Sequence, residues 1–403
     1  MFLSVLLPTH NGLPYLRHAV ESVRRQDDPD WEVIVSDNAS EEDVEGFVRE
    51  LDEPRVRYVQ TDSFVPVTHN WNNALRHSSG DWVVMLGADD ALLPGYSSAL
   101  RQTIDRCRGP QAGDSGAYQF AYPGVMPDAP DGYLRLTLTA PFFAYSREPF
   151  VVDPEQTREL ARAAAGMRNL YDFNMQHAAV SRATIEQLSA GGEFWRSPFP
   201  DYYAMNHLFW SCPRIAVDPH PIVVVGISPR SHGFLFYNHR EADALAMLSS
   251  HQVEPEILAE LEDVLLPGTN MNTSWLVAMQ TLYRALGSPS EMRPDYARYR
   301  RLQLIFCEQA HLVHRALDRD QLAAVEATLS PGVRLAVRTA GPPAGWLLRR
   351  FPDVRPRAGA VFDRIIGRQV KVARPALPES GRYETVIDVL DRFEPSSVPA
   401  SSV

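Results

Sequence analysis

A short apolar strand that runs directly into two adjacent carboxylates is the feature that most constrains this sequence. Trp82 to Leu86 is an apolar run, and Gly87-Ala88-Asp89-Asp90 follows it before Pro94 restarts the chain as an expected helix. Loops at the carboxyl ends of strands in α/β sheets converge on a ligand crevice. Two carboxylates are costly to desolvate there unless a cation neutralises them. Magnesium or manganese holding a diphosphate is the expected partner, because hard cations take oxygen ligands.

The bulk composition is that of a globular protein with more than one domain. The chain has 403 residues, of which 45% are apolar and 22% charged, and this balance excludes wholesale disorder. A net charge of −11 argues against a dedicated nucleic-acid binder. The three cysteines, Cys107, Cys212 and Cys307, predict neither a disulfide framework nor a cysteine metal site. Without a basic leader or a long apolar run, we expect a cytoplasmic protein.

Strand and helix alternate through residues 1–108, which predicts a mainly parallel sheet with right-handed crossovers. We expect strands at 3–7, 31–35, 57–60 and 82–86, with helices at 14–26, at 40–51 and before residue 78. Ser40 and Asp43 form the capping box that would open the second helix. Frequent Gly and Pro between Gly109 and Pro130 predict a loop. Further on we expect strands at 134–143, 177–180 and 222–225, helical stretches within 154–190, and helices from 240 to 329.

Three regions are expected along the chain. Residues 1–240 form the α/β domain, residues 241–330 form a helical acceptor-side or homodimer region, and residues 331–403 form a basic tail with a disordered end. Residues 331–374 hold ten basic and two acidic residues, a net charge of +8. This segment suits an anionic membrane surface, at the inner face, or an acidic acceptor. The alternative, which we favour, is a solvated face that pairs with the acidic remainder.

Polar residues follow the first two expected strands. Pro8-Thr9-His10-Asn11 ends the first strand and Ser36-Asp37-Asn38 ends the second, so both open on the same sheet edge as Asp89 and Asp90. A carboxylate such as Asp37 accepts the N–H of a nucleobase edge, and His10 is suited to stacking on a base. The chain lacks a Gly-x-Gly-x-x-Gly run after the first strand and lacks a P-loop, which disfavours both of those nucleotide sites.

Three blocks together resemble the family-2 glycosyltransferases of GT-A fold. They are Ser4 to Gly12, Val33 to Ser40 and Gly80 to Gly95, and their order and spacing match the family. The resemblance covers roughly residues 1–240 and implies an inverting transfer from a nucleotide-sugar donor, often a uridine diphosphate sugar. It also implies a divalent metal, magnesium or manganese.

The resemblance assigns roles by position. The implied donor contacts lie at the strand ends, on the third helix and in the acidic motif: Pro8, Thr9, His10, Asn11, Asp37, Asn70, Ala88 and Asp89. Asp90 is the implied metal ligand, with Asp89 on the ribose or in the metal shell. The sequence departs from the family where Gly87 replaces a usual Asp, where His10 replaces a common Tyr, and where Thr68-His69-Asn70 replaces a frequent Ala-Arg-Asn.

An inverting transfer needs a base that removes the acceptor proton. The family carries it after a Gly-Gly-Phe-like turn, and here Gly191-Gly192-Glu193-Phe194 leads to Asp201. Asp201 is therefore the candidate base, and Glu193 is its nearest competitor. Gly226 to Phe234 resembles a loop over the donor, in which Arg230 would hold a phosphate and His232 would be a third metal ligand.

Simpler explanations exist for each of these residues. Asp89, Asp90 and Asp201 could be helix caps, and Asp37 could be a turn residue. His232 could be unliganded and Arg230 a surface charge. Two rival functions also stay open. One is a non-catalytic member that binds a nucleotide sugar or a partner, and the other is a sugar-nucleotide pyrophosphorylase. The second rival would need a Gly-rich basic loop after the first strand, which Pro8 to Gly12 does not supply.

Overall fold

The computed structural model describes most of the chain, and the account that follows is confined to those residues. They are 1–126, 129–137, 146–168, 170–171, 174–231, 234–235, 253–266, 271–309, 319–332 and 383–392, with single positions between 334 and 350. The predicted domain boundary at residue 240 lies outside the described residues, and so do residues 351–382.

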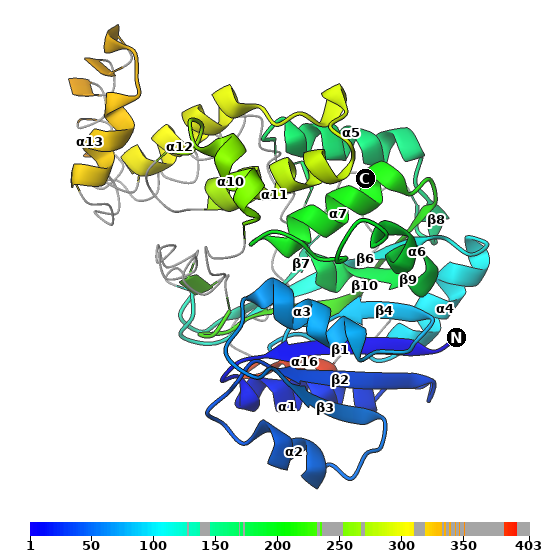
Figure 1. Ribbon diagram of the computed structural model, residues 1–403. Coiled ribbons are helices and arrows are strands. Elements are labelled where there is room, and N and C mark those ends of the chain that lie inside the picture. Colours follow the sequence, from blue (N-terminus) through cyan, green and yellow to red (C-terminus); the bar gives the residue numbers. More distant parts are fainter. Residues whose placement is uncertain are drawn as a thin grey trace.

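The described strands form one ten-stranded mixed sheet at the centre of the molecule (Figure 1). Its order is β3-β2-β1-β4-β9-β6-β10-β5, with β7 beside β6 and β8 beside β10. Strands β1 to β4, β6 and β10 run in one direction, because β9 is antiparallel to both β4 and β6. The predicted fold class, a mainly parallel α/β sheet flanked by helices with a helical C-terminal region, is confirmed.

The first part of the chain alternates strands and helices as predicted. The elements are β1 Leu3–Thr9, α1 Leu13–Arg24, β2 Trp31–Asp37, α2 Val44–Glu50, β3 Val56–Gln60, α3 Val67–Arg76, β4 Trp82–Met85, β5 Ala91–Leu92 and α4 Tyr96–Arg106. Strands β2 and β4 are buried along their whole length and β1 along nearly all of it. Burial on both faces explains why these strands are continuous apolar runs in the sequence.

The second part completes the sheet and adds helices on one side. Its elements are β6 Ala112–Ala121, β7 Tyr133–Thr137, β8 Phe150–Val151, α5 Pro154–Ala165, η2 Met175–His177, β9 Ala178–Ser181, α6 Arg182–Leu188, α7 Pro200–Ser211, β10 Ile215–Ile227, α10 Pro255–Leu261, α11 Met271–Ala285, η4 Ser290–Met292, α12 Tyr296–Gln309, α13 Arg319–Ala327 and α16 Val386–Arg392. The predicted helices after residue 240 are confirmed where the structure describes them.

The loop predicted between Gly109 and Pro130 is wrong, because β6 runs through the middle of it. This strand is buried and pairs with β7, β9 and β10. A Cβ on Gly116 would lie 3.1 Å from the Pro219 carbonyl oxygen of β10. The glycine therefore permits a close approach of two strands where composition alone suggested a loop.

The predicted capping box at the start of α2 is also wrong. Asp43 itself is the N-cap, and its carboxylate accepts the Gly46 N–H at 2.8 Å. The Ser40 hydroxyl instead accepts the Asn11 N–H at 2.9 Å, so this serine joins the loop after β2 to the loop after β1.

Two apolar layers enclose the sheet. Val5 and Leu7 of β1 face a cluster with α1 and α2, whereas Leu6 faces a cluster with α3, α5, α7 and α11. The indole N–H of Trp275 on α11 donates to the Ala164 carbonyl oxygen of α5 at 3.0 Å. The helical region thus shares a core with the sheet rather than packing only on itself.

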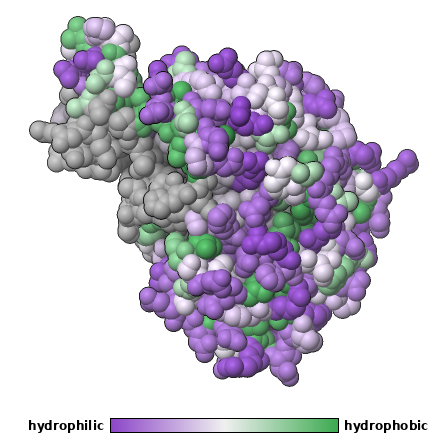
Figure 2. Space-filling view, viewed as in Figure 1, coloured by the Kyte–Doolittle hydropathy of each residue, from purple (hydrophilic) through white to green (hydrophobic). Residues whose placement is uncertain are grey.

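The surface is mainly polar. On the face seen in Figure 2, hydrophilic residues dominate the region of the first strands, and hydrophobic residues form scattered spots. No described helix is both long enough and apolar enough to cross a membrane.

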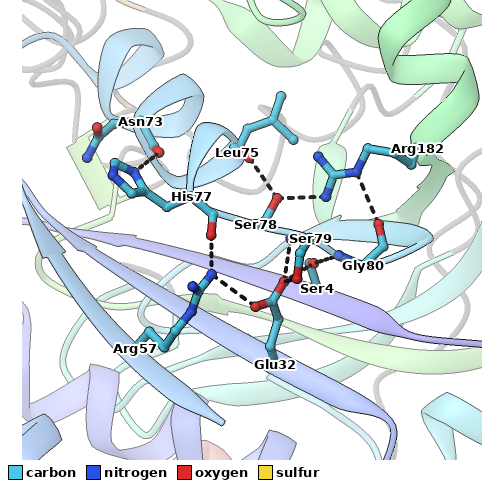
Figure 3. A network of polar contacts seen from close by, with 10 residues as sticks. All are labelled: Ser4, Glu32, Arg57, Asn73, Leu75, His77, Ser78, Ser79, Gly80 and Arg182. Atoms are coloured by element: carbon cyan, nitrogen blue, oxygen red, sulfur yellow. Dashed lines mark hydrogen bonds and ion pairs between the residues drawn. The ribbon is translucent and has the colours of Figure 1, made fainter. Parts of the chain in front are cut away.

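A buried carboxylate organises the edge of the sheet opposite to the strand ends that carry the acidic motif (Figure 3). Glu32, at the start of β2, is 6% exposed. Its Oε1 accepts from the Ser4 hydroxyl at 2.7 Å and from the Ser79 N–H at 2.5 Å, and its Oε2 lies 3.1 Å from Arg57. Arg182 donates to the Gly80 carbonyl oxygen at 3.1 Å, which fixes the same turn from β9's side. Burial raises the pKa of the Glu32 carboxyl, but these partners outweigh burial and hold it below its ordinary value.

The Glu32 network predicts a pH-dependent stability. Because the folded-state pKa of Glu32 is below its ordinary 4.5, the stabilisation is present above that pH and is lost as the pH falls. Glu32→Gln should lower the free energy of unfolding at pH 7 by about 1–3 kcal/mol. The control is Glu50→Gln at an exposed position of α2. Urea unfolding at pH 7 and pH 4 measures both effects, and an equal loss in the two variants would contradict this role of Glu32.

Candidate functional site

The carboxyl ends of β1, β2 and β4 lie side by side, as the sequence predicts. Strand β1 is parallel to both β2 and β4, and Thr9 is in register with Asp37. Asn11 joins the two following loops, since its N–H donates to Ser40 and its Oδ1 accepts the Glu41 N–H at 2.8 Å. Asn11 has a φ of 50°, a conformation that asparagine tolerates better than most residues.

Asp37 is buried at this edge and is held by neutral donors. It is 1% exposed, and its carboxylate accepts from the Ser40 N–H at 3.1 Å and from the Tyr58 hydroxyl at 3.0 Å. Burial, followed by the hydrogen bond to Asp37, raises the pKa of Tyr58, so this phenol stays protonated. Thr9 is also buried, and its hydroxyl oxygen has no hydrogen-bond partner within the described part of the chain.

His10 is exposed beside a second aromatic ring. Its Nδ1 lies 2.8 Å from the Asn38 carbonyl oxygen, and its ring centroid is 4.7 Å from that of Phe64, which is 50% exposed. Asn38 holds the Phe64 loop, because its amide donates to the Val65 carbonyl oxygen at 2.6 Å and accepts the Val65 N–H at 2.8 Å. Two aromatic faces are thus fixed next to Asp37.

Asp90 ties the end of β4 to β10. It is 2% exposed, and its Oδ2 accepts the Gly87 N–H while its Oδ1 accepts the Gly226 N–H, each at 2.7 Å. Asp89 is only partly buried, and its Oδ2 accepts the Ser228 N–H at 3.0 Å. Of the two carboxylates, Asp89 therefore has access to a ligand.

The carboxylate pair is electrostatically costly. Burial, then the neighbouring Asp89 carboxylate, raises the pKa of Asp90, and burial also raises the pKa of Asp89. The groups that oppose these shifts are hydrogen-bond donors, and no cation is among them in the described chain. Hard carboxylate oxygens with an unbalanced charge fit a divalent cation. The described residues supply no cluster of three or more metal-ligating side chains, so a diphosphate would have to complete the coordination.

Two glycines make this packing possible. A Cβ on Gly87 would lie 2.5 Å from Asp90 Oδ2, and a Cβ on Gly226 would lie 1.9 Å from the Asp89 carbonyl oxygen. The departure at Gly87 therefore has a steric reason, because a side chain there would displace the Asp90 carboxylate from the N–H that it accepts.

Asp201 and Asp90 are linked through one short turn. Asp201 lies in the first turn of α7, and its Oδ1 accepts the Met175 N–H of η2 at 2.9 Å. The next residue, Gln176, donates a side-chain hydrogen bond to Asp90. Consecutive residues of η2 thus contact the candidate base and the acidic motif, which brings the two predicted groups into one site.

The other predicted residues divide into three groups. Ala88 lies on the loop beside Asp89, and Pro8 ends β1 next to Thr9. Asn70 uses both ends of its amide on Ser36, accepting from the hydroxyl at 2.7 Å and donating to the carbonyl oxygen at 3.0 Å, and it is 3% exposed, so its predicted donor contact stays a prediction. His232 lies outside the described residues.

Arg230 and Asp89 both lie within electrostatic reach of Tyr15 on α1. Burial and the Asp89 carboxylate raise the pKa of Tyr15, and the Arg230 guanidinium opposes this shift. Tyr15, Gln176 and Ser228 are site residues that the sequence reasoning missed. A signal existed only for the last, since Gly226 ends an apolar strand run, where glycine often marks a close backbone approach.

The first part of the chain is similar in sequence to known glycosyltransferases. Residues 4–110 match the family model described as glycosyl transferase family 2. A Campylobacter jejuni GalNAc(5)-diNAcBac-PP-undecaprenol beta-1,3-glucosyltransferase is 39% identical over 103 residues, which are 25% of this chain and 33% of that protein. The Escherichia coli UDP-Glc:alpha-D-GlcNAc-diphosphoundecaprenol beta-1,3-glucosyltransferase WfgD is 25% identical over 87 residues, which are 22% of this chain and 34% of that protein.

A solved structure with a similar outline is S. aureus TarS 1-349 in complex with UDP-GlcNAc. It has a TM-score of 0.44 and 14% identity, over 89% of this chain and 92% of that one. The chain spans only about a third of the length of the curated relatives that it matches. The matched segment holds Thr9, Asp37, Asp89 and Asp90, and over residues 4–110 the chain is similar to glycosyl transferase family 2.

Proposed function

We propose that this protein is an inverting glycosyltransferase that moves a sugar from a nucleotide diphospho-sugar, with uridine diphosphate as the expected nucleotide, to a hydroxyl or amine acceptor. The observation that carries the proposal is the joint placement of Asp37, Asp89 and Asp201. The first two follow β2 and β4, the strands on either side of β1, and the third is held by the same η2 turn that contacts Asp90.

The site residues would have separate roles in donor binding and in the transfer step. Asp37 would accept an N–H of the base, His10 and Phe64 would lie against the base, and Arg230 would pair with a phosphate. Asp201 would take the acceptor proton while the acceptor attacks the anomeric carbon and the bond to the diphosphate breaks. A divalent cation, when bound, supplies positive charge to the departing diphosphate.

We assign the cation contact to Asp89 and a supporting role to Asp90. The sequence prediction gave Asp90 to the metal, yet both of its oxygens accept backbone N–H groups. Asp90 is also 2% exposed, whereas Asp89 is only partly buried and is the more accessible of the two to a cation. His232 stays a predicted third ligand that lies outside the described residues.

The rival non-catalytic function was motivated by Gly87 and by the missing basic residue at His69. The steric reason for Gly87 weakens the first motive, because the glycine serves the Asp90 contacts. A pyrophosphorylase is disfavoured by the loop after β1, which Asn11 ties to the loop after β2 and which carries no basic residue other than His10. Inner-membrane attachment through the basic tail, and a homodimer contact of the helical region, stay predictions.

Asp89 and Asp90 should respond differently when each is changed to asparagine. Asp90→Asn should lower the free energy of unfolding by about 1–3 kcal/mol, because a buried amide cannot accept two N–H groups as the carboxylate does. Asp89→Asn should stay within about 1 kcal/mol of the parent and lose manganese-dependent UDP binding. Chemical unfolding and calorimetry with UDP, with and without manganese, measure both. Retained metal-dependent binding in Asp89→Asn would contradict the assignment.

Restoring the family residue at position 87 should harm this protein. Gly87→Asp and Gly87→Ala should each destabilise the fold by about 1–3 kcal/mol and weaken UDP binding, because the new Cβ displaces Asp90. The matched control is Gly191→Ala, since a Cβ there meets nothing within 4 Å. Thermal melting and UDP titration test this, and tighter UDP binding in Gly87→Asp would refute the steric account.

Asp201 is the position at which loss of turnover should occur without loss of donor binding. Asp201→Asn can still accept the Met175 N–H, so UDP affinity should be unchanged while turnover falls by roughly 10²–10⁴-fold. The control is Glu193→Gln, the competing carboxylate, which contacts Asn72 and Arg76. A product-mass screen over nucleotide sugars and acceptors supplies the assay. Equal turnover in Asp201→Asn and the parent would place the base elsewhere.

A further inference from the structure

The last described helix, α16, is folded onto the N-terminal half of the molecule, beside α1 (Figure 1). Its start is a capping box, in which the Asp388 carboxylate accepts the Thr385 N–H at 2.8 Å and the Thr385 hydroxyl accepts the Asp388 N–H at 3.4 Å. At its other end Asp391 forms an ion pair at 2.5 Å with Arg25, the C-cap residue of α1. The helix therefore has a defined start and a fixed place on the sheet domain.

The contacts of α16 are apolar and buried. Val386, Val389 and Leu390 are each at most 5% exposed. They share a cluster with Tyr118 and Phe120 of β6, with Tyr122 directly after that strand, with Leu134 of β7 and with the end of β10. Burial of three such side chains is worth several kcal/mol in total, which is enough to hold a helix of this length in place.

The same cluster reaches the acidic motif. Tyr122 contacts Tyr15 edge-on, with centroids 5.2 Å apart. Burial, then the Asp89 carboxylate, raises the pKa of Tyr122, whose hydroxyl also lies near the Val386 N–H at the start of α16. Tyr122 is thus placed between the C-terminal helix and the candidate metal ligand.

The segment after β10 is held at two points. Its turn is fixed at one end, where the Ser228 N–H donates to Asp89 and the Ser231 hydroxyl donates to the Ser228 carbonyl oxygen at 2.9 Å. At the other end Phe234 packs against the cluster that contains α16. Arg230 lies on the turn between these two points.

We propose that α16 is a positioning element that holds the Ser228–Ser231 turn, and with it Arg230, against Asp89. The turn is anchored to Asp89 at its start and is followed by Phe234, which packs against the cluster that contains α16, so removal of α16 would weaken the second of these two supports. This inference rests on the proposed function only for its nucleotide readout, because the order of the turn is measured independently.

Limited trypsin digestion of the full chain tests the proposal, since Arg230–Ser231 and Arg392–Phe393 are both tryptic bonds. Leu390→Asp places a charge in the cluster and should release α16, which faster cleavage after Arg392 reports. Cleavage after Arg230 should then accelerate roughly tenfold, while cleavage after Arg76 on α3 is unchanged. The UDP dissociation constant should rise by a similar factor.

Three variants separate positioning from general loss of structure. Leu258→Asp makes the same chemical change at a 40% exposed position of α10 and should leave all rates unchanged. Leu390→Met keeps an apolar side chain of similar size and should cleave and bind UDP like the parent. If Leu390→Asp does not fold, Leu390→Ala takes its place. Faster cleavage after Arg392 with unchanged cleavage after Arg230 would overturn the proposal. Absence of UDP binding by the parent would instead count against the proposed function and leave the cleavage result to decide the role of α16.

Discussion

The Asp90 carboxylate is the interaction on which the rest of the site depends. By accepting one N–H from Gly87 and one from Gly226, it joins the end of β4 to β10, two strands that do not pair with each other in the sheet. Leaving either of these buried backbone donors without an acceptor would be costly. The two hydrogen bonds fix the loop that presents Asp89, and they explain why neither glycine can carry a side chain.

The Asp89 and Asp90 carboxylates lie side by side at this edge of the sheet, where a positively charged ligand would be favoured. Two neighbouring carboxylates with raised pKa values are unfavourable in the protein alone, so the site gains most from a ligand that brings positive charge. A divalent cation bound with a diphosphate would be such a ligand, because Asp89 would hold it and its charge would offset that of the carboxylates. Tyr15 and Arg230 lie within electrostatic reach of the pair, and Tyr122 reaches Asp89 and Asp90 from the side of α16.

The sequence was sufficient for the elements whose identity is local. Strands β1, β2 and β4 are predictable because strands buried on both faces are continuous apolar runs, and the polar residues that follow them had to share an edge. Strand β6 was missed because its small residues and glycines serve close contact with β10. Gln176 and Tyr122 were missed because their roles come from contacts across the fold, which no local pattern encodes.

The candidate site is built from both halves of the chain, because residues after 110 contact the acidic motif. The family match ends at residue 110, yet Asp90 is bound by Gly226 and Gln176, Asp89 by Ser228, and the Ser228 turn is supported through a cluster that includes α16. Changes in the second half can therefore alter the position and charge of the acidic motif without changing its sequence. The matched segment supplies the two carboxylates, while the partners contributed after residue 110 determine how firmly they are held.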